Sequence, residues 1–495
     1  MTPAAPGSQP WSIAAFLIYL VLMVVIGIVT VRFSSSGIGA FFLGGRRMKS
    51  FVVALSAVTS GRSAWLLIGM SGLAFTRGVS AVWAVVGYIL MELFLFLYAG
   101  RRLRCFTGRM DDITVPDYLE SRFEDRTHKL RVIAAVPILI FMTAYLAAQF
   151  TAGGKSLSAS FGMTPLQGLL LTAGIVVFYS VAGGFLAVCI TDMLMGLFMI
   201  FALMILPAIS ILHLGGFGVL LETLQAFSPR LIDPFAISAG ALIGYVGIGL
   251  GSPGNPHILN RYMSIDKPEN LRKTGLIGTI WNVLMSWGAI YIGLAGRALY
   301  GDVSALPGAD PENIYPLLAS EHLHPFLFGL TIAAVVAAIM STASSQLLVA
   351  ASTVVRDIYQ RTMAEGREIA QKKLVFLSRA ATLLVAVAAI VFGAFADKLV
   401  FYLVLFAWGG LGAAFGPTIL LSLYWKKVTR AGAVAGVFTG TAVQIAWYLT
   451  PSFKAVIAEW VPAFFMSLAA VVAVSLATSP PAGIDRLMSC MREDE

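Results

Sequence analysis

The stretch that decides the fold is Gly247-Ile248-Gly249-Leu250-Gly251-Ser252-Pro253-Gly254-Asn255-Pro256-His257. Four glycines and two prolines among its first ten residues oppose a regular helix, because proline lacks a backbone donor and each interior glycine costs about 1 kcal/mol. The stretch ends an apolar segment, 236–256, that is long enough to cross a bilayer. A break at membrane depth persists only where protein or a cavity surrounds it. We therefore predict a discontinuous membrane helix here; a helix end at Pro256 is the alternative.

A second interruption lies upstream, in Ser56-Ala57-Val58-Thr59-Ser60-Gly61-Arg62-Ser63-Ala64-Trp65. A charge at the bilayer centre costs about 2.5 kcal/mol or more, so Arg62 is expected to face the protein interior and to be paired. Gly61 offers a place for the helix to relax. Glu92 and Asp192 are the candidate counter-charges, and the residues alone leave that choice open, because Asp192 also fits a helix start at the headgroups. The alternative for the whole stretch is close helix packing by small residues.

The rest of the chain has the composition of a membrane protein. Of its 495 residues, 58% are hydrophobic and 12% are charged, whereas a soluble domain carries about 25% charged residues. Long apolar segments without strand-like alternation predict an all-α polytopic membrane protein. About thirteen spans are expected, near 11–32, 51–75, 79–100, 131–153, 164–182, 187–212, 236–256, 275–299, 324–350, 376–396, 399–425, 432–450 and 457–477.

The basic residues orient these spans. If Met1 lies outside, the loops on the cytoplasmic side and the C-terminal tail hold 27 of the 34 Lys and Arg residues, with Arg261 counted among them. This excess is typical of cytoplasmic loops. We expect a plasma membrane protein, in bacteria the inner membrane, with its N-terminus outside and its C-terminus in the cytoplasm. The net charge of +9 then reflects topology and does not indicate nucleic-acid binding.

The two interruptions fall in the second and seventh spans, five spans apart. Interrupted helices at matching places in two halves indicate a transporter binding site at an inverted repeat. This spacing predicts a peripheral first helix at 1–34 and a first five-helix repeat at 35–212. A second repeat follows at 213–425, and peripheral spans with a short tail occupy 426–495.

A third polar cluster lies in the ninth span, at Ala338-Ile339-Met340-Ser341-Thr342-Ala343-Ser344-Ser345-Gln346. Hydroxyls in a membrane helix often bond to their own backbone, which is the simpler interpretation. Four hydroxyls in five residues also indicate a site for a hard cation such as Na⁺, because such cations prefer oxygen ligands.

Nine short motifs run in order along nearly the whole chain: Phe42-Leu43-Gly44-Gly45-Arg46, Ala54-Leu55-Ser56-Ala57, Ser63 with Trp65-Leu66-Leu67, Leu119 with Arg122-Phe123-Glu124-Asp125, Gly183-Gly184-Phe185-Leu186-Ala187-Val188, Thr191-Asp192, Gly254 with Pro256-His257-Ile258-Leu259, Met340-Ser341-Thr342 with Gln346-Leu347-Leu348-Val349, and Gly412-Ala413-Ala414-Phe415-Gly416-Pro417. With these motifs the chain resembles the sodium:solute symporters, and among them the sodium/proline symporters. The resemblance implies a LeuT-type 5+5 inverted repeat with discontinuous helices, and transport by alternating access.

The resemblance also implies site residues. The family's ion site falls on Thr59, Arg62, Ala338, Ser341 and Thr342, and its proline-binding positions fall on Ser63, Ala64, Trp65, Tyr145, Ile248, Ser252 and Pro256. Broken-helix and charge-coupling roles fall to Gly61, Glu92, Asp192 and Gly251. Two departures stand out. Gly61 and Arg62 replace an aspartate and an uncharged residue, and Ile248 and Ser252 replace an aromatic pair.

These observations predict a secondary active transporter of a small organic solute, an amino acid or a related small carboxylate, with no cofactor and with Na⁺ as the coupling ion. The expected partners are the solute and the lipid bilayer, and neither nucleic acid nor nucleotide. A sodium-independent exchanger, uniporter or proton-coupled carrier, in which Arg62 replaces the ion, is the first alternative. A transporter-like membrane sensor is the second. An enzyme is not expected, because HExxH, GxSxG and Walker A motifs are absent from the sequence.

Overall fold

The computed structural model describes residues 9–30, 38–364, 367–395 and 399–492. These residues form helices and no β-strand, apart from one isolated bridge between Met48 and Ile265. The helices are α1 (Pro10–Thr30), α2 (Ile38–Leu43), α3 (Ser50–Ala64), α4 (Ser71–Arg77), α5 (Trp83–Phe94), α6 (Gly100–Met110), α7 (Val115–Phe123), α8 (Lys129–Phe161), α9 (Pro165–His213), α10 (Phe217–Phe227), α11 (Ala239–Val246), α12 (Pro256–Ser264), α13 (Asn270–Tyr300), α14 (Ile314–His322), α15 (Pro325–Ser352), α16 (Gln371–Ala394), α17 (Val400–Tyr424), α18 (Arg430–Leu449), α19 (Pro451–Lys454), α20 (Trp460–Leu476) and α21 (Ile484–Ser489). Shorter π- and 3₁₀-helical segments connect several of them, among them η4 (Trp65–Met70), η6 (Leu95–Ala99), η8 (Gly247–Gly254) and η12 (Thr353–Met363).

A helix or a pair of helices lies in each segment where a span was predicted. Eight helical stretches of the described chain are long and apolar enough to cross a membrane. Shorter or interrupted helices fill the other segments, so the count of thirteen crossings stays a prediction. Arg32 and Lys398, both counted in the charge asymmetry, and the expected boundary at residue 34 lie outside the described residues.

The fifth and sixth predicted spans form α9, which breaks at Gly184 (φ 61°, ψ −173°). Both ends of α9 lie beside the start of α15. His213 contacts His322, with 2.6 Å between their Nδ1 atoms. At the other end Phe161, the last residue of α8 and four residues before α9, packs on Phe16. Phe16 is one turn from Ser12, whose hydroxyl donates to the Pro325 carbonyl (2.9 Å). The chain therefore reverses direction at Gly184, a backbone conformation that glycine adopts without the Cβ penalty of other residues.

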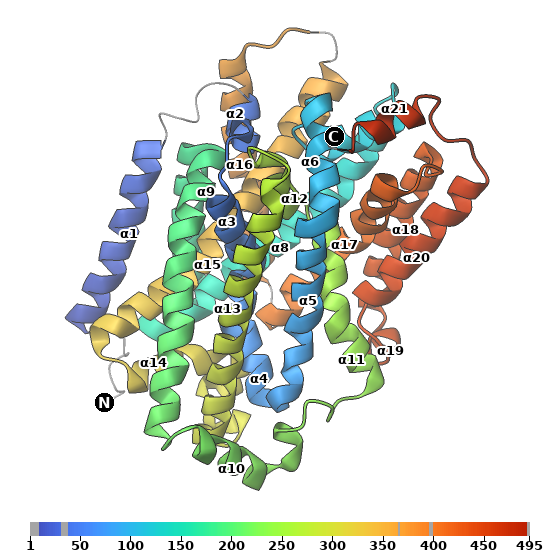
Figure 1. Ribbon diagram of the computed structural model, residues 1–495. Coiled ribbons are helices and arrows are strands. Elements are labelled where there is room, and N and C mark those ends of the chain that lie inside the picture. The colour runs from blue at the N-terminus through green and yellow to red at the C-terminus, as the bar shows by residue number, and fades with distance from the viewer. Residues whose placement is uncertain (1–8, 31–37, 365–366, 396–398, 493–495) are drawn as a thin grey trace.

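The centre of the bundle is formed by α15 and α17, which are buried along most of their length. The outer helices instead expose large apolar side chains, such as Phe376 and Leu384 of α16 and Phe438 of α18. A helix that is apolar on all sides belongs in the interior, and one with an outward apolar face in a membrane protein meets lipid. Figure 1 shows α10 and α21 at opposite ends of this bundle.

The alternative of a helix end at Pro256 is wrong. After the break the chain continues as α12, whose nine residues are all buried. The placement of Arg261 in a cytoplasmic loop is wrong for the same reason, because its side chain has no exposed surface. The sequence predicted a loop here because the residues of α12 are polar. In the structure these residues are buried, because polar groups on other helices bind them.

Candidate functional site

The first broken helix is interrupted at Ser63, which has φ 47° and ψ −168°. The left-handed backbone thus falls two residues after Gly61. A non-glycine residue in such a conformation costs of order 1–3 kcal/mol and is held by its surroundings. Here the Ala64 amide donates to Gln149 Oε1 (3.3 Å), and the Trp65 amide donates to the Ser63 hydroxyl (3.1 Å). Polar side chains therefore satisfy the backbone where α3 gives way to η4.

The second broken helix runs from α11 through the 3₁₀ segment η8 to α12, with an extended residue at Asn255 (φ −90°, ψ 105°). The Asn255 side chain donates to the carbonyls of Gly251 (2.8 Å) and Trp408 (3.2 Å). Trp408 in turn donates from its indole to the Ile248 carbonyl (2.9 Å). Two side chains thus replace the hydrogen bonds that a regular helix would make, as membrane burial requires.

The two breaks meet at a small cavity of about 10 Å³, room for no more than one water. Trp65, Tyr145 and Ile248, three of the predicted substrate positions, line it together with Gly61, Tyr88 and Trp408. The rings lie close, with centroids 5.3 Å apart for Tyr88 and Trp408 and 5.7 Å apart for Trp65 and Phe401.

The remaining predicted substrate positions, Ser63, Ala64, Ser252 and Pro256, belong to the two breaks themselves and are buried. The Ser252 hydroxyl and the Trp65 indole N–H are buried without a hydrogen-bond partner in the described chain. Unpartnered buried donors of this kind are costly unless something else binds them.

Ser341 and Thr342, two of the predicted ion-site residues, reach the first break from α15. Thr342 Oγ1 donates to the Ser60 carbonyl (2.9 Å), and the hydroxyls of Ser341 and Ser60 lie 2.9 Å apart. Ala338 lies one turn earlier on α15 and is fully buried. Thr59 is buried as well, and its hydroxyl has no hydrogen-bond partner among the described residues. The hydroxyls of α15 therefore meet α3 next to its break.

Arg62, also assigned to the ion site, points elsewhere. Its Nε donates to Asn282 Oδ1 of α13, and Asn282 Nδ2 donates to Glu92 Oε2 of α5. Its guanidinium carbon lies 3.6 Å from the centre of the Tyr88 ring. Of the two candidate counter-charges, Glu92 is therefore the one that faces Arg62, through the Asn282 amide.

Asp192 has a different partner, which the sequence did not indicate. Its carboxylate accepts from Arg261 Nη2 (2.9 Å) and from the Ser56 hydroxyl (2.6 Å). Arg261 also donates to the hydroxyls of Ser60 (2.7 Å) and Ser345 (2.5 Å). Arg261 was missed because its segment is too polar to be assigned to a span; the need of a buried Asp192 for a cation was the available signal.

Gly61 is in close contact with Tyr88. A Cβ at position 61 would overlap the Tyr88 hydroxyl, so a larger residue there is excluded while Tyr88 keeps its place. The Tyr88 hydroxyl occupies the space that the Cβ of an aspartate at position 61 would need. The ring of the same tyrosine stacks against the Arg62 guanidinium. Gly61, Arg62 and Tyr88 therefore form one mutually dependent arrangement.

Comparison with known proteins agrees with this architecture. The family model described as the sodium:solute symporter family matches residues 41–440. The osmoregulated proline transporter OpuE of Bacillus subtilis is 36% identical over 468 residues, covering 94% of each chain. The sodium/proline symporter of Escherichia coli is 38% identical over 440 residues, covering 88% of this chain and 87% of the relative.

Two solved structures share the fold. A Na⁺-coupled sialic acid symporter, in a substrate-bound outward-open state, superposes with a TM-score of 0.82 at 18% identity, covering 95% of this chain and 98% of the other. MhsT in complex with L-phenylalanine gives a TM-score of 0.56 at 15% identity, covering 87% and 99%. These likenesses confirm the predicted all-helical, LeuT-type architecture with discontinuous helices.

Proposed function

Because the chain belongs to the sodium:solute symporter family, we propose that it couples Na⁺ to the uptake of a small amino acid, with proline as the first substrate to test. Family membership makes it a secondary transporter and not an enzyme. Its relatives are named as proline transporters, and this suggests that the solute is an amino acid.

The contacts of Thr342 with the Ser60 carbonyl and of Ser341 with the Ser60 hydroxyl, beside the break in α3, carry this proposal. Hydroxyl and carbonyl oxygens at such a junction are the ligands that a hard cation prefers. Arg62 directs its guanidinium away from this junction, to α5 and α13. The cation beside the junction is Arg261, and its charge is balanced by the Asp192 carboxylate. Backbone carbonyls of Thr59 and Ala338 are the further ligands that we assign to Na⁺.

The solute is placed between the two breaks, with its ring or side chain against Trp65 and Tyr145 and its polar groups toward Ser63, Ser252 and the broken backbone. Arg62 has two buried terminal nitrogens without a hydrogen-bond partner among the described residues. A guanidinium matches a carboxylate in a bidentate fashion, so we assign the solute carboxylate to Arg62. The cavity is too small for an amino acid, and transport then requires the helices around it to separate in turn toward each side.

A second candidate is a carrier that needs no sodium. The observation in its favour is the arrangement of Gly61, Arg62 and Tyr88, which puts a fixed cation and a phenol where the resemblance expects a carboxylate and a neutral residue. In that case Arg62 supplies the positive charge of the missing ion, and Glu92 or Asp192 is available to carry a proton.

Uptake of labelled proline into proteoliposomes, with and without an inward sodium gradient, separates the two candidates. For the symporter, the gradient accelerates uptake, and Thr342→Ala removes most of that acceleration. Thr331→Ala is the matched control, because the Thr331 hydroxyl on the same helix bonds its own backbone at Leu327 (2.7 Å). If the sodium gradient changes proline uptake neither in the wild type nor in Thr342→Ala, sodium coupling is rejected and the second candidate is supported.

Membrane orientation and repeat boundaries complete the proposal. The end of the bundle that holds α21 (Figure 1) carries most of the basic residues, so we assign it to the cytoplasm, of bacteria in the first instance. We keep 35–212 and 213–425 as the two repeats. Protease protection of a tag placed after Arg492 in sealed inside-out and right-side-out vesicles tests this orientation.

A further inference from the structure

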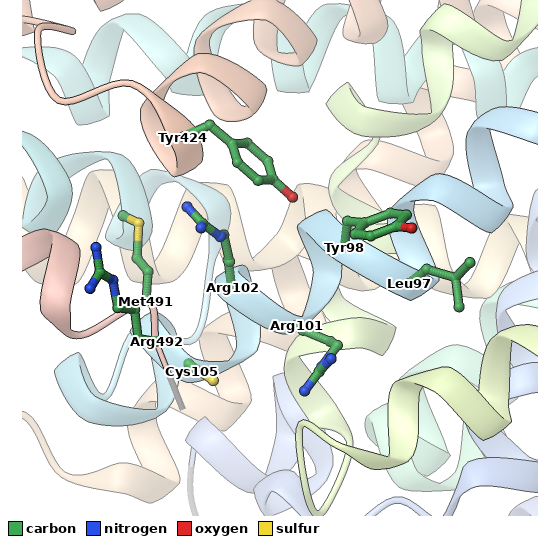
Figure 2. A pocket seen from close by; sticks show the side chains of 8 residues that line it. All are labelled: Leu97, Tyr98, Arg101, Arg102, Cys105, Tyr424, Met491 and Arg492. Carbon is green, nitrogen blue, oxygen red and sulfur yellow. The ribbon is translucent and has the colours of Figure 1, made fainter. Parts of the chain in front are cut away.

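A groove of about 270 Å³ opens between the end of the third predicted span and the C-terminal segment. Tyr98, Arg101, Arg102, Tyr424, Met491 and Arg492 line it, as Figure 2 shows. We propose that this groove binds the phosphate of an anionic phospholipid, such as phosphatidylglycerol, as a fixed part of the transporter's lipid environment. Nothing in the transport site described above uses these residues.

The groove lies at the level where the chain leaves the membrane. The helical stretch that forms one wall is apolar from Trp83 to Ala99, apart from the buried Glu92, and turns basic at Arg101. Below the groove Leu90, Phe94 and Tyr98 follow at four-residue spacing and are 61%, 37% and 58% exposed, so they form one outward stripe. Tyrosine is enriched at headgroup depth. An acyl chain along this stripe would bring its phosphate to the arginines.

Arg102 is positioned for an anion that the described chain does not provide. Its Nη1 donates to the Leu423 carbonyl (2.7 Å), and its guanidinium carbon lies 4.4 Å from the centre of the Tyr424 ring. Among the described residues, no carboxylate lies within 4.0 Å of Arg102 or Arg492.

Other cations at the same end of the bundle differ in this respect. Lys426 pairs with Asp485 (2.6 Å), and Arg430 pairs with Asp125 (3.0 Å). In the groove, by contrast, Arg102 and Arg492 lack a carboxylate partner among the described residues and lie near aromatic rings at the membrane surface. These are the features of the basic pockets that bind phospholipid headgroups.

The opposite wall is fixed in place. Leu487 and Met491 of the C-terminal segment are buried, and Arg109 Nη1 donates to the Ser489 carbonyl (2.9 Å). This docking brings Arg492 to the groove from a part of the chain more than 380 residues away from Arg102. The site is therefore built by the tertiary fold and is absent from either segment alone.

Native mass spectrometry of the delipidated full-length protein tests the proposal by titration with phosphatidylglycerol. We expect binding to weaken roughly tenfold or more in Arg102→Gln/Arg492→Gln, because each basic side chain at the surface adds to the attraction of an anionic lipid. Arg272→Gln/Lys273→Gln is the matched control, since both residues are exposed at the start of α13, and we expect it to bind like the wild type. Arg492→Gln alone, a change at an exposed position, is expected to give a smaller loss without a risk to folding.

Three outcomes would overturn the proposal: equal binding of phosphatidylcholine, equal binding by the double variant and the wild type, or displacement of the lipid by inorganic phosphate or glycerol 3-phosphate at comparable concentration. The last would identify a site for a free anion. Deletion of the acidic residues 493–495 removes the carboxylates that follow Arg492 in the sequence. Lipid binding is expected to hold or rise in that variant, and a loss there also contradicts the proposal.

Discussion

Arg62 of α3 and Arg261 of α12 are both fully buried, yet the protein holds them in different ways. Arg261 meets the Asp192 carboxylate directly, and hydroxyls from α3 and α15 accept further hydrogen bonds from it. Arg62 reaches its carboxylate, Glu92, only through Asn282. Its two terminal nitrogens have no hydrogen-bond partner in the described chain.

The difference indicates that Arg261 is a structural residue, whereas Arg62 has hydrogen-bond donors that remain available to a ligand. A buried charge is tolerated when its donors are satisfied, and an unsatisfied one carries a desolvation cost. Arg261 ties α12 to α3, α9 and α15, so its contacts are complete within the protein. Arg62 keeps donors free beside Tyr88, whose ring lines the aromatic cavity, and this is the arrangement expected of a group that meets a ligand.

The largest effect is expected for Arg261→Gln. Removing one partner of a buried ion pair leaves an uncompensated charge and costs about 3–5 kcal/mol, so we expect a strong fall in the melting temperature of the purified protein and in its yield. Arg261→Gln/Asp192→Asn removes both charges and should recover part of the loss. A normal melting temperature for the single variant would mean that Arg261 is not a structural residue.

Arg62→Met should change transport more than stability. A hydrogen bond to a charged group contributes about 1.5–3 kcal/mol, so we expect the apparent affinity for a carboxylate-bearing solute to fall at least tenfold, measured as KM in proteoliposomes. Arg62→Lys keeps the charge without the planar fork and should lie between the two. Unchanged affinity in Arg62→Met would remove Arg62 from the substrate site and would make the two arginines alike.

Gly61→Ala tests whether Tyr88 holds the Arg62 guanidinium in place. The added methyl group would overlap the Tyr88 hydroxyl, and overpacking of this kind costs about 1–3 kcal/mol. Tyr88→Phe in the same background removes the overlapping atom and should restore part of the melting temperature.

The matched control is Gly174→Ala, because a Cβ at that helical position meets no atom within 4 Å. There alanine should be neutral or stabilising by up to about 1 kcal/mol. Equal effects at positions 61 and 174 would argue against the contact with Tyr88.

The smallest effect concerns Arg131, a third buried arginine, which lies near the bundle end and bonds Glu120 (2.6 Å). Burial opposes the charge on Glu120, but hydrogen bonds from Arg131 and His128 outweigh it and lower the pKa of this carboxyl. A lowered pKa stabilises the fold above the usual value of about 4.3, and this contribution disappears as the pH falls through the folded-state pKa. The melting temperatures of wild type and Glu120→Gln should differ at pH 7 and converge only as the pH falls below about 4.3, toward the lowered folded-state pKa; a gap that widens in acid would contradict this sign.

Several features were predicted because they depend on local composition. The lengths of the apolar segments located the helices, and glycine and proline at Gly247–Pro256 located a break that no regular helix tolerates. The break in α3 was predicted to within a few residues, although the left-handed residue is Ser63 and Gly61 is instead required by contact with Tyr88. The roles of the site residues stay predictions until they are tested.

Other features escaped prediction because they depend on helices that are distant in the chain. The reversal between the spans at 164–182 and 187–212 was predicted, whereas only the structure shows that one residue, Gly184, makes it within a continuous helical stretch. Arg261 looked like a loop residue, because a hydropathy criterion judges a segment by its own residues and not by the oxygens that other helices bring to it.

By itself the sequence determined that this protein is a multi-spanning helical membrane protein of the sodium:solute symporter family, since both follow from composition and ordered motifs. Only the tertiary structure decided which acid faces which arginine. Glu92 and Asp192 are equivalent in sequence as buried carboxylates, and the packing of α5 and α13 around Arg62, and of α9 around Arg261, distinguishes them. Pairing in a low-dielectric interior acts over a few ångströms, and such distances are set by the packing of the helices.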